Sequence, residues 1–160
     1  MTGLSASDEF DEFYRAQWPR LAGTLRLLSG EATIADDTAQ DAFTLAWRRW
    51  DRVSRMDRPA GWLYTTAFRL LRRRMVRDAR RARPLALDGA VDFDVIDRVS
   101  LQRALAGLPM RQRQAVVARH VLGLNGPHAA ELLDMGHDNF RQVLSRACHA
   151  LRLSPELMEG

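Results

Sequence analysis

The amino-acid sequence predicts an all-α protein made of two small helical domains joined by a linker. Apolar residues recur at three- and four-residue spacing through most of the 160-residue chain, and no alternating run of strand-like length occurs. An apolar content of 46% is enough to give each domain a hydrophobic core. We place the first domain at residues 1–83, the linker at 84–99 and the second domain at 100–160.

In the first domain the apolar spacing predicts three helices. The first ends at the stop signal Gly30, and Pro19 either kinks it or begins its main part. Thr33 is a suitable N-cap for the second helix, which ends before a loop over residues 51–61. A long arginine-rich helix follows, from about Pro59 to Ala82.

The remaining sequence predicts a linker and four short helices. The segment PLALDGAVDFDVIDR (84–98) loses the arginines that precede it and gains four aspartates, so it is typical of a linker. The helical segments are SLQRALAGL, MRQRQAVVARHVLGL after the break at Pro109, GPHAAELLDM and GHDNFRQVLSRACHALR. A tight connection over 134–136 separates the last two, which predicts a helix-turn-helix.

Charge is segregated along the chain, which contains 24 arginines and no lysine. Residues 1–46 hold eight acidic residues and three arginines, a net charge of −5. Residues 47–83 hold thirteen arginines and three acidic residues, a net charge of +10. This pattern predicts two partners, a polyanion such as nucleic acid for the basic segment and a different surface for the acidic one. A long helix solvated by its arginines is the alternative.

Placed on a helix, residues 36–50 are amphipathic, with an acidic and polar face. At about 100° per residue, the apolar side carries Ala39, Ala42, Phe43, Ala46 and Trp50. The opposite side carries Asp37, Gln40, Asp41, Thr44 and Arg48. Such a face is poorly suited to phosphate and well suited to a basic protein surface. A helix face that is only solvated is the alternative.

The arginine-rich helix has a face typical of proteins that bind single-stranded nucleic acid. Opposite its buried leucines it carries Trp62, Thr65, Arg69, Arg72, Arg73 and Arg77. There the cations can follow a backbone while the exposed tryptophan takes an unstacked base. Stacking contributes about 1–3 kcal/mol per base, whereas opening about ten base-pair steps costs roughly 14 kcal/mol. Duplex opening of that size therefore needs a partner protein.

The last helix has the pattern of a DNA-recognition helix. Phe140, Val143, Leu144, Ala147 and Leu151 share one side, and Arg141, Gln142, Ser145, Arg146 and Arg152 lie on the other. Arg141 and Gln142 can pair with guanine and adenine edges in a major groove. Arg146 and Arg152 are better suited to phosphates. A generic helical hairpin shows similar periodicity and is the alternative.

Composition and motifs exclude several classes of function. The single cysteine, Cys148, allows no internal disulfide, and the four scattered histidines lack zinc-ligand spacing, so we expect no metal and no cofactor. No nucleophile–base pairing, phosphate loop or carboxylate dyad occurs, so we do not expect an enzyme. No signal-like segment opens the chain and no apolar run approaches about 18 residues. We therefore expect a cytoplasmic protein without membrane insertion.

In this order, the segments resemble an extracytoplasmic-function (ECF, group IV) sigma factor, the small two-domain class of the sigma-70 family. ADDTAQDAFTLAW (35–47) is similar to that family's polymerase-binding helix, and PAGWLYTTAFRLLRRR (59–74) to its promoter-melting helix. ALAGLPMRQRQAVVARHVLGL followed by AAELLDMGHDNFRQVLSRACHALR resembles its minus-35-reading domain. The resemblance covers nearly the whole chain.

The resemblance implies a sigma region 2-like bundle, a region 4-like helix-turn-helix and a role in directing core RNA polymerase to promoter DNA. It implies polymerase contacts at Asp37, Gln40, Asp41, Thr44 and Arg48. It implies contacts with the minus-10 non-template strand at Trp62, Arg69, Arg72, Arg73 and Arg77, and a flipped base in the 51–61 loop. Minus-35 contacts are implied for Asn139, Arg141, Gln142, Ser145 and Arg146. An anti-sigma protein is a further expected partner, and the free chain is expected to be a monomer.

Three departures from the family pattern keep two alternatives open. Leu70 stands where the family often has asparagine, Asp134 where the turn usually has glycine, and Val143 where the recognition helix usually has arginine. One alternative is a sigma-like regulator or decoy held by protein partners, which promoter-specific RNA synthesis in a purified system excludes. The other is a free-standing helix-turn-helix repressor, which tight binding to duplex DNA without polymerase favours.

Overall fold

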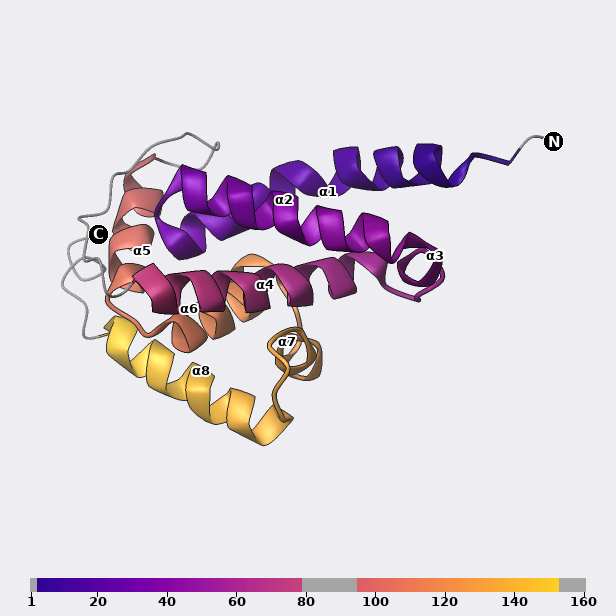
Figure 1. Cartoon of the computed structure of the whole chain (residues 1–160). Coiled ribbons are helices and arrows are strands. Elements are labelled where there is room, and N and C mark those ends of the chain that lie inside the picture. Colours follow the sequence, from indigo (N-terminus) through magenta and orange to yellow (C-terminus); the bar gives the residue numbers. More distant parts are fainter. Residues whose placement is uncertain (1–2, 79–94, 153–160) are drawn as a thin grey trace.

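The structure is a computed structural model that describes residues 3–78 and 95–152, and every regular element in these ranges is helical (Figure 1). The predicted all-α fold is confirmed. The first half contains α1 (Ala6–Ser29), α2 (Ala32–Arg48), α3 (Trp50–Val53) and α4 (Pro59–Asp78). The second half contains α5 (Val95–Ala106), α6 (Met110–Val116), the π-helical turn η1 (Val117–Val121), α7 (Gly126–Leu132) and α8 (His137–Arg152).

Local hydrogen bonds define the two ends of α1. The Ser5 hydroxyl accepts from the backbone N–H of Asp8, and the Asp8 carboxylate accepts from the backbone N–H of Ser5, both at 3.2 Å. The helix continues through Pro19. Gly30 follows its last residue at φ 74°, a left-handed conformation that favours glycine, and donates its N–H to the carbonyl of Arg26 (2.8 Å). The predicted stop at Gly30 is therefore confirmed.

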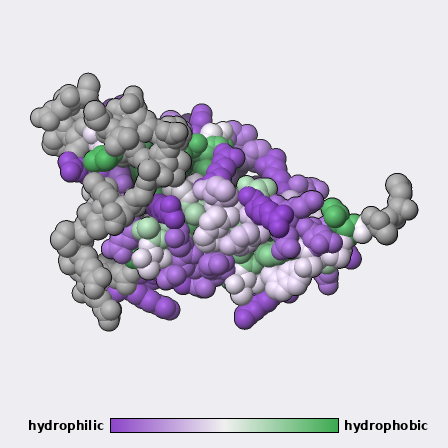
Figure 2. Space-filling model, turned by 90° about the horizontal axis from the view of Figure 1, so that it is seen from above, coloured by the Kyte–Doolittle hydropathy of each residue, from purple (hydrophilic) through white to green (hydrophobic). Residues whose placement is uncertain are grey.

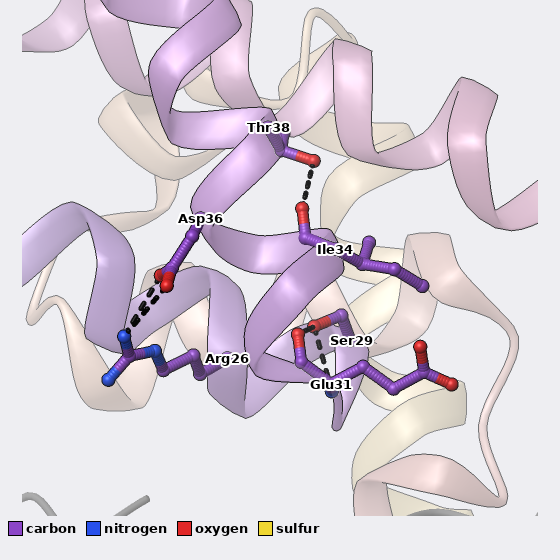
Figure 3. A network of polar contacts seen from close by, with 6 residues as sticks. All are labelled: Arg26, Ser29, Glu31, Ile34, Asp36 and Thr38. Carbon is purple, nitrogen blue, oxygen red and sulfur yellow. Dashed lines mark hydrogen bonds and ion pairs between the residues drawn. The ribbon is translucent and has the colours of Figure 1, made fainter. Parts of the chain in front are cut away.

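The predicted cap of α2 is wrong. The helix begins at Ala32, so Glu31 rather than Thr33 occupies the N-cap position. Figure 3 shows the reason, because the Ser29 hydroxyl holds the connection by accepting from the Glu31 backbone N–H (3.2 Å) and donating to the Glu31 carbonyl (3.0 Å). This turn replaces the capping bond that Thr33 was expected to make.

Two further predicted boundaries differ from the structure. The loop expected over 51–61 is shorter, because α3 and the first turn of α4 occupy its two ends. The end of the expected linker is helical, since α5 begins at Val95. The remainder of that linker and the end of the expected arginine-rich helix lie outside the described residues.

One hydrophobic core joins the two halves. In Figure 1, α1 and α2 lie above α4, whereas α6, α7 and α8 lie below it. Phe43 and Phe68 from the first half and Leu105 and Phe140 from the second are at most 2% exposed and belong to the same cluster. α4 is thus covered by α2 on one side and by the second half on the other.

An aromatic cluster fixes α2 and α3 against α1. The Phe43 ring packs on Tyr14 and Trp18, with ring centroids 4.6 and 5.9 Å apart. Trp50 of α3 packs on Phe13 at 5.2 Å. Aromatic pairs at these separations stabilise a fold beyond the area they bury. The cluster therefore orients α2 so that its polar face points to solvent.

Candidate functional site

The acidic and polar face predicted on α2 lies at the surface. All five of its members are exposed, namely Asp37, Gln40, Asp41, Thr44 and Arg48. The Thr44 hydroxyl donates to the backbone carbonyl of Gln40 (2.8 Å), a bond within the helix that leaves the Gln40 amide available to a partner. We call these five residues the α2 strip.

Arginines of the same chain hold two of the three aspartates in this helix. Figure 3 shows Arg26 of α1 pointing at Asp36, with contacts of 2.9 and 3.1 Å to its two carboxylate oxygens. Asp41 forms an ion pair with Arg74 of α4. Asp37 is exposed and makes no ion pair within the described residues. Among the described residues, the Asp37 carboxylate is thus exposed without an ion-pair partner, whereas Asp41 is paired with Arg74.

The arginine face of α4 is shared between solvent and the second half of the chain. Arg73 and Arg77 are exposed. Arg69 forms an ion pair with Asp134 (3.2 Å), and Arg72 donates to the side-chain oxygen of Gln114 (2.9 Å). Two of the four arginines expected to contact nucleic acid thus contact the second half in this structure.

Arg72 is half-buried at this contact. Burial, followed by the positive charges of Arg111 and Arg69, lowers the pKa of its guanidinium. Arg72 nevertheless stays protonated at neutral pH, because the ordinary pKa of arginine lies so far above it. Gln114 is fully buried, and its amide nitrogen donates to the carbonyl of Phe68 (3.0 Å) while its oxygen accepts from Arg72.

The position of Trp62 differs from the expectation. The sequence predicts an exposed tryptophan among arginines, but the side chain is half-buried and packs against the hydrophobic core. Helical periodicity places a residue on a face without showing which other elements cover that face. A half-buried ring leaves less surface on which a base can stack.

α7, the following turn and α8 form the predicted helix-turn-helix. Asn125 caps α7 by accepting from the backbone N–H of His128 (2.9 Å). Asp134 in the turn has φ 56°, a left-handed conformation that aspartate tolerates better than most residues. A Cβ at position 126 would lie 2.6 Å from Nε2 of His137, so a larger residue there would displace this exposed imidazole.

The polar face of α8 is exposed as predicted. Phe140 and Ala147 are buried, and Val143 and Leu144 are half-buried against the core. All five residues expected to contact DNA are exposed, namely Asn139, Arg141, Gln142, Ser145 and Arg146. Their contacts with DNA remain a prediction.

The sequence analysis did not identify two residues of α6 that join the halves. Arg113 donates to the carbonyl of Leu28 at the end of α1 (2.9 Å), and its neighbour Gln114 bonds to α4. One signal was available for Gln114. Gln114 lies four residues after Met110 and three before Val117, a spacing that places all three residues on one face of a helix. A polar side chain therefore lies among apolar ones on that face.

One face of the molecule carries mainly hydrophilic and intermediate residues. Figure 2, a view from above, shows these residues over most of that face, with small and separate hydrophobic patches. In the part of the chain that the structure describes, no helix is long and apolar enough to cross a membrane. Nor do these residues include a group of three or more His, Cys, Asp or Glu placed to hold a metal ion.

Comparisons with known proteins identify the family of this chain. Sigma-70 region 2 matches residues 13–82. The ECF RNA polymerase sigma factor SigM of Mycobacterium tuberculosis is 30% identical over 145 residues, which cover 86% of this chain and 72% of that protein. The ECF RNA polymerase sigma factor SigL of the same organism is 28% identical over 142 residues, covering 79% of this chain and 77% of that protein.

Two solved structures share the fold. The sigma factor RpoE from Bartonella quintana, in complex with the anti-sigma factor NepR, has a TM-score of 0.69 and 22% identity, covering 90% of this chain and 94% of that chain. CnrH in complex with the cytosolic domain of CnrY has a TM-score of 0.66 and 23% identity, covering 90% and 85%.

Proposed function

The chain belongs to the ECF RNA polymerase sigma factors, and we propose that it binds core polymerase through α2 and promoter DNA through α4 and α8. One observation carries this proposal. The helical frame presents an acidic and polar strip on α2, an arginine face on α4 and an exposed polar face on α8, each with different chemistry. The protein then acts by binding, without a catalytic site, in the cytoplasm where core polymerase works.

The α2 strip is the proposed polymerase contact. Asp37 and Asp41 suit a basic protein surface, while Gln40 and Thr44 supply neutral hydrogen-bonding groups. A single exposed ion pair contributes only about 0–1 kcal/mol, so several contacts must act together. Trp47 of the same helix is 48% exposed and offers apolar area beside them.

The α4 face is the proposed contact with the minus-10 non-template strand. Arg73 and Arg77 are accessible in this structure, whereas Arg69 and Arg72 have partners in the second half. If all four arginines contact the DNA strand, Arg69 and Arg72 must exchange their present partners for phosphates. The polymerase complex supplies the free energy of strand opening that stacking on this face cannot.

α8 is the proposed reader of the minus-35 element. Arg141 and Gln142 are exposed and suited to guanine and adenine edges, and Arg146 to a phosphate. Val143, which stands where the family usually has arginine, is half-buried. This substitution therefore changes the packing of α8 more directly than its contacts with bases. The altered residue in the turn, Asp134, pairs with Arg69 rather than facing away from the first half.

The proposed organisation has domains at 1–83 and 100–160 joined by the linker at 84–99. One of the solved structures described above contains a sigma factor together with an anti-sigma factor. This likeness supports an anti-sigma partner for this chain, and we expect the free chain to be a monomer.

The polymerase contact is tested by pull-down of purified core enzyme with Asp37→Arg/Gln40→Ala. Asp41 stays unchanged because its ion pair with Arg74 links α2 to α4. Asp11→Arg, an exposed position on α1, is the control with the same change of charge. We expect the wild type and the control to retain polymerase and the double variant to bind about tenfold more weakly. Equal retention by all three proteins contradicts the assignment of α2.

The two alternatives predict different results. A regulator or decoy binds polymerase but gives no promoter-specific transcripts, and the occupied Arg69 and Arg72 are the observation that favours it. A repressor binds duplex DNA tightly and specifically without polymerase. A filter-binding assay without core polymerase detects the repressor, and transcription with core polymerase distinguishes the regulator from a promoter-directing sigma factor.

A further inference from the structure

One arginine of α4 is bonded to α2. The guanidinium of Arg74 forms an ion pair with Asp41 and donates to the Thr38 hydroxyl (2.9 Å). Asp41 belongs to the α2 strip, and Arg74 lies within the run of arginines on α4. We propose that this contact couples the two binding surfaces: a cation of the polymerase on Asp41 releases Arg74, which then binds a phosphate of the minus-10 strand. The inference rests on the proposed functions of α2 and α4.

The contact has one buried partner and one exposed partner on α2. Thr38 is 0% exposed, and its hydroxyl donates to the Ile34 carbonyl of its own helix (2.7 Å), as Figure 3 shows, while accepting from Arg74. The Asp41 side chain is 54% exposed, whereas that of Arg74 is 30% exposed. A protein partner can therefore reach the Asp41 carboxylate from solvent while Arg74 is still held at Thr38.

A second cation on Asp41 disfavours the present position of Arg74. Two like charges beside one carboxylate repel each other, and such placements are costly at a protein interface. Thr38, a neutral acceptor, then holds the guanidinium by a single hydrogen bond. The ion pair itself is partly exposed, so salt screens it and it is weak. A basic surface that makes several contacts with the α2 strip can therefore displace it.

The released guanidinium has a second position on α4. Arg74 follows Arg73 directly and precedes Arg77 by three residues, a spacing that makes Arg74 and Arg77 neighbours on the helix surface. Arg73 and Arg77 are exposed. Their like charges disfavour a third guanidinium beside them in the free chain, whereas a phosphate favours it because it pairs with arginine. Arg74 thus adds a fifth arginine to the four expected to contact the strand.

The coupling acts in both directions. A phosphate that binds Arg74 leaves the Asp41 carboxylate free for a cation of the polymerase. By thermodynamic linkage, DNA and polymerase then raise the affinity of the chain for each other by the same factor.

The first test measures binding of oligo(dT) of about 15 nucleotides to the free chain at several salt concentrations. Asp41→Asn releases Arg74 without polymerase. One further phosphate contact should steepen the slope of log affinity against log salt by about 0.7 and raise the affinity about fivefold, equivalent to about 1 kcal/mol. Asp36→Asn, the same change at the ion pair of α2 with Arg26 of α1, is the matched control and should leave the slope unchanged.

A double variant separates release of Arg74 from the loss of one negative charge. In an Arg74→Gln background, Asp41→Asn should no longer steepen the slope, because the arginine that it releases is absent. The coupling is overturned if Asp41→Asn steepens the slope no more than Asp36→Asn does, or if it steepens the slope equally with and without Arg74.

The second test measures the affinity for core polymerase. Arg74→Gln removes the cation that competes for Asp41, so we expect it to bind core polymerase about fivefold more tightly than the wild type. Arg15→Gln, the same change at an exposed position of α1, is the control and should keep the affinity of the wild type. Binding by Arg74→Gln that is no tighter than that by Arg15→Gln overturns the coupling.

Failure of the proposed function gives a different result. Arg73→Ala/Arg77→Ala removes two exposed cations of the α4 face and is expected to weaken oligo(dT) binding. If this pair and the double variant of the α2 strip each weaken binding of their partner while the Asp41 and Arg74 variants match their controls, only the coupling is overturned. If either double variant leaves the binding of its partner unchanged, that surface does not bind the partner, and the coupling is overturned with it.

Discussion

Arg113→Met tests whether one arginine holds the C-terminal ends of two helices. The Arg113 guanidinium donates to the carbonyls of Leu28 at the end of α1 (2.9 Å), Leu108 (2.9 Å) and Ala106 at the end of α5 (3.3 Å). The carbonyls of Leu28 and Ala106 lie in the last turn of their helices, at the negative end of the helix dipole, so a cation stabilises them. Leu108 lies in the turn that follows α5. Burial lowers the pKa of Arg113, which reflects the opposing cost of removing its charge from water.

The expected loss follows from these bonds. A hydrogen bond from a charged group contributes about 1.5–3 kcal/mol, so the two shorter bonds give about 3–6 kcal/mol. The cost of burying the cation offsets part of this. Methionine fills the volume of the arginine stem without that cost. We therefore expect Arg113→Met to lower the free energy of unfolding by about 2–4 kcal/mol.

Urea unfolding followed by circular dichroism measures the loss, with an unchanged m-value as the sign that the unfolded state is unaffected. Arg119→Met, at an exposed position of η1, is the control and is expected to change stability by less than about 0.5 kcal/mol. Arg113→Lys should fall between them, because an ammonium group cannot reach all three carbonyls. An Arg113→Met loss within about 0.5 kcal/mol of the control refutes the capping role.

Three further predictions concern the first half. Phe43→Ala removes the centre of the aromatic cluster and should lower the free energy of unfolding in urea by about 3–5 kcal/mol, and a loss below about 1 kcal/mol contradicts the role of the cluster. Gly30→Ala places a Cβ on a residue with φ 74° and should lower the free energy of unfolding by about 1–2 kcal/mol. Gly23→Ala lies within α1 with open space around the new Cβ, so it should leave the free energy of unfolding unchanged or raise it. Equal effects of the two changes in the same assay contradict the role of Gly30 in ending α1. Hydrogen bonds from Ser5 hold the pKa of Asp8 below its ordinary 3.8, so the stabilisation from this cap is present above that pH and is lost as the pH falls through the lower folded value. An NMR titration should show the Asp8 pKa returning toward 3.8 in Ser5→Ala, and an unchanged pKa contradicts the capping box.

Much of the fold follows from signals within single helices. The spacing of apolar residues predicted the helical class and the exposed α2 strip, because one amphipathic helix carries the information for its own polar face. Gly30 itself predicted the end of α1. The tight connection around Asp134 likewise marked the helix-turn-helix. These features depend on residues that lie near one another in the chain.

Contacts between helices were not predictable in this way. Trp62 was expected to be exposed, but the packing of neighbouring elements covers part of it. The ion pair of Arg69 with Asp134 and the bond of Arg72 to Gln114 join residues separated by 65 and 42 positions. Periodicity places each of these side chains on a face of its own helix and says nothing about which distant face it meets.

Run-off transcription with purified core RNA polymerase tests most directly whether this chain is a promoter-directing sigma factor. Core enzyme alone and core enzyme with this protein are given the same genomic fragments. We predict discrete, promoter-specific transcripts only when the protein is present, and their loss with Asp37→Arg/Gln40→Ala but not with Asp11→Arg. Polymerase that binds the wild-type protein yet makes no specific transcript from any fragment contradicts promoter direction.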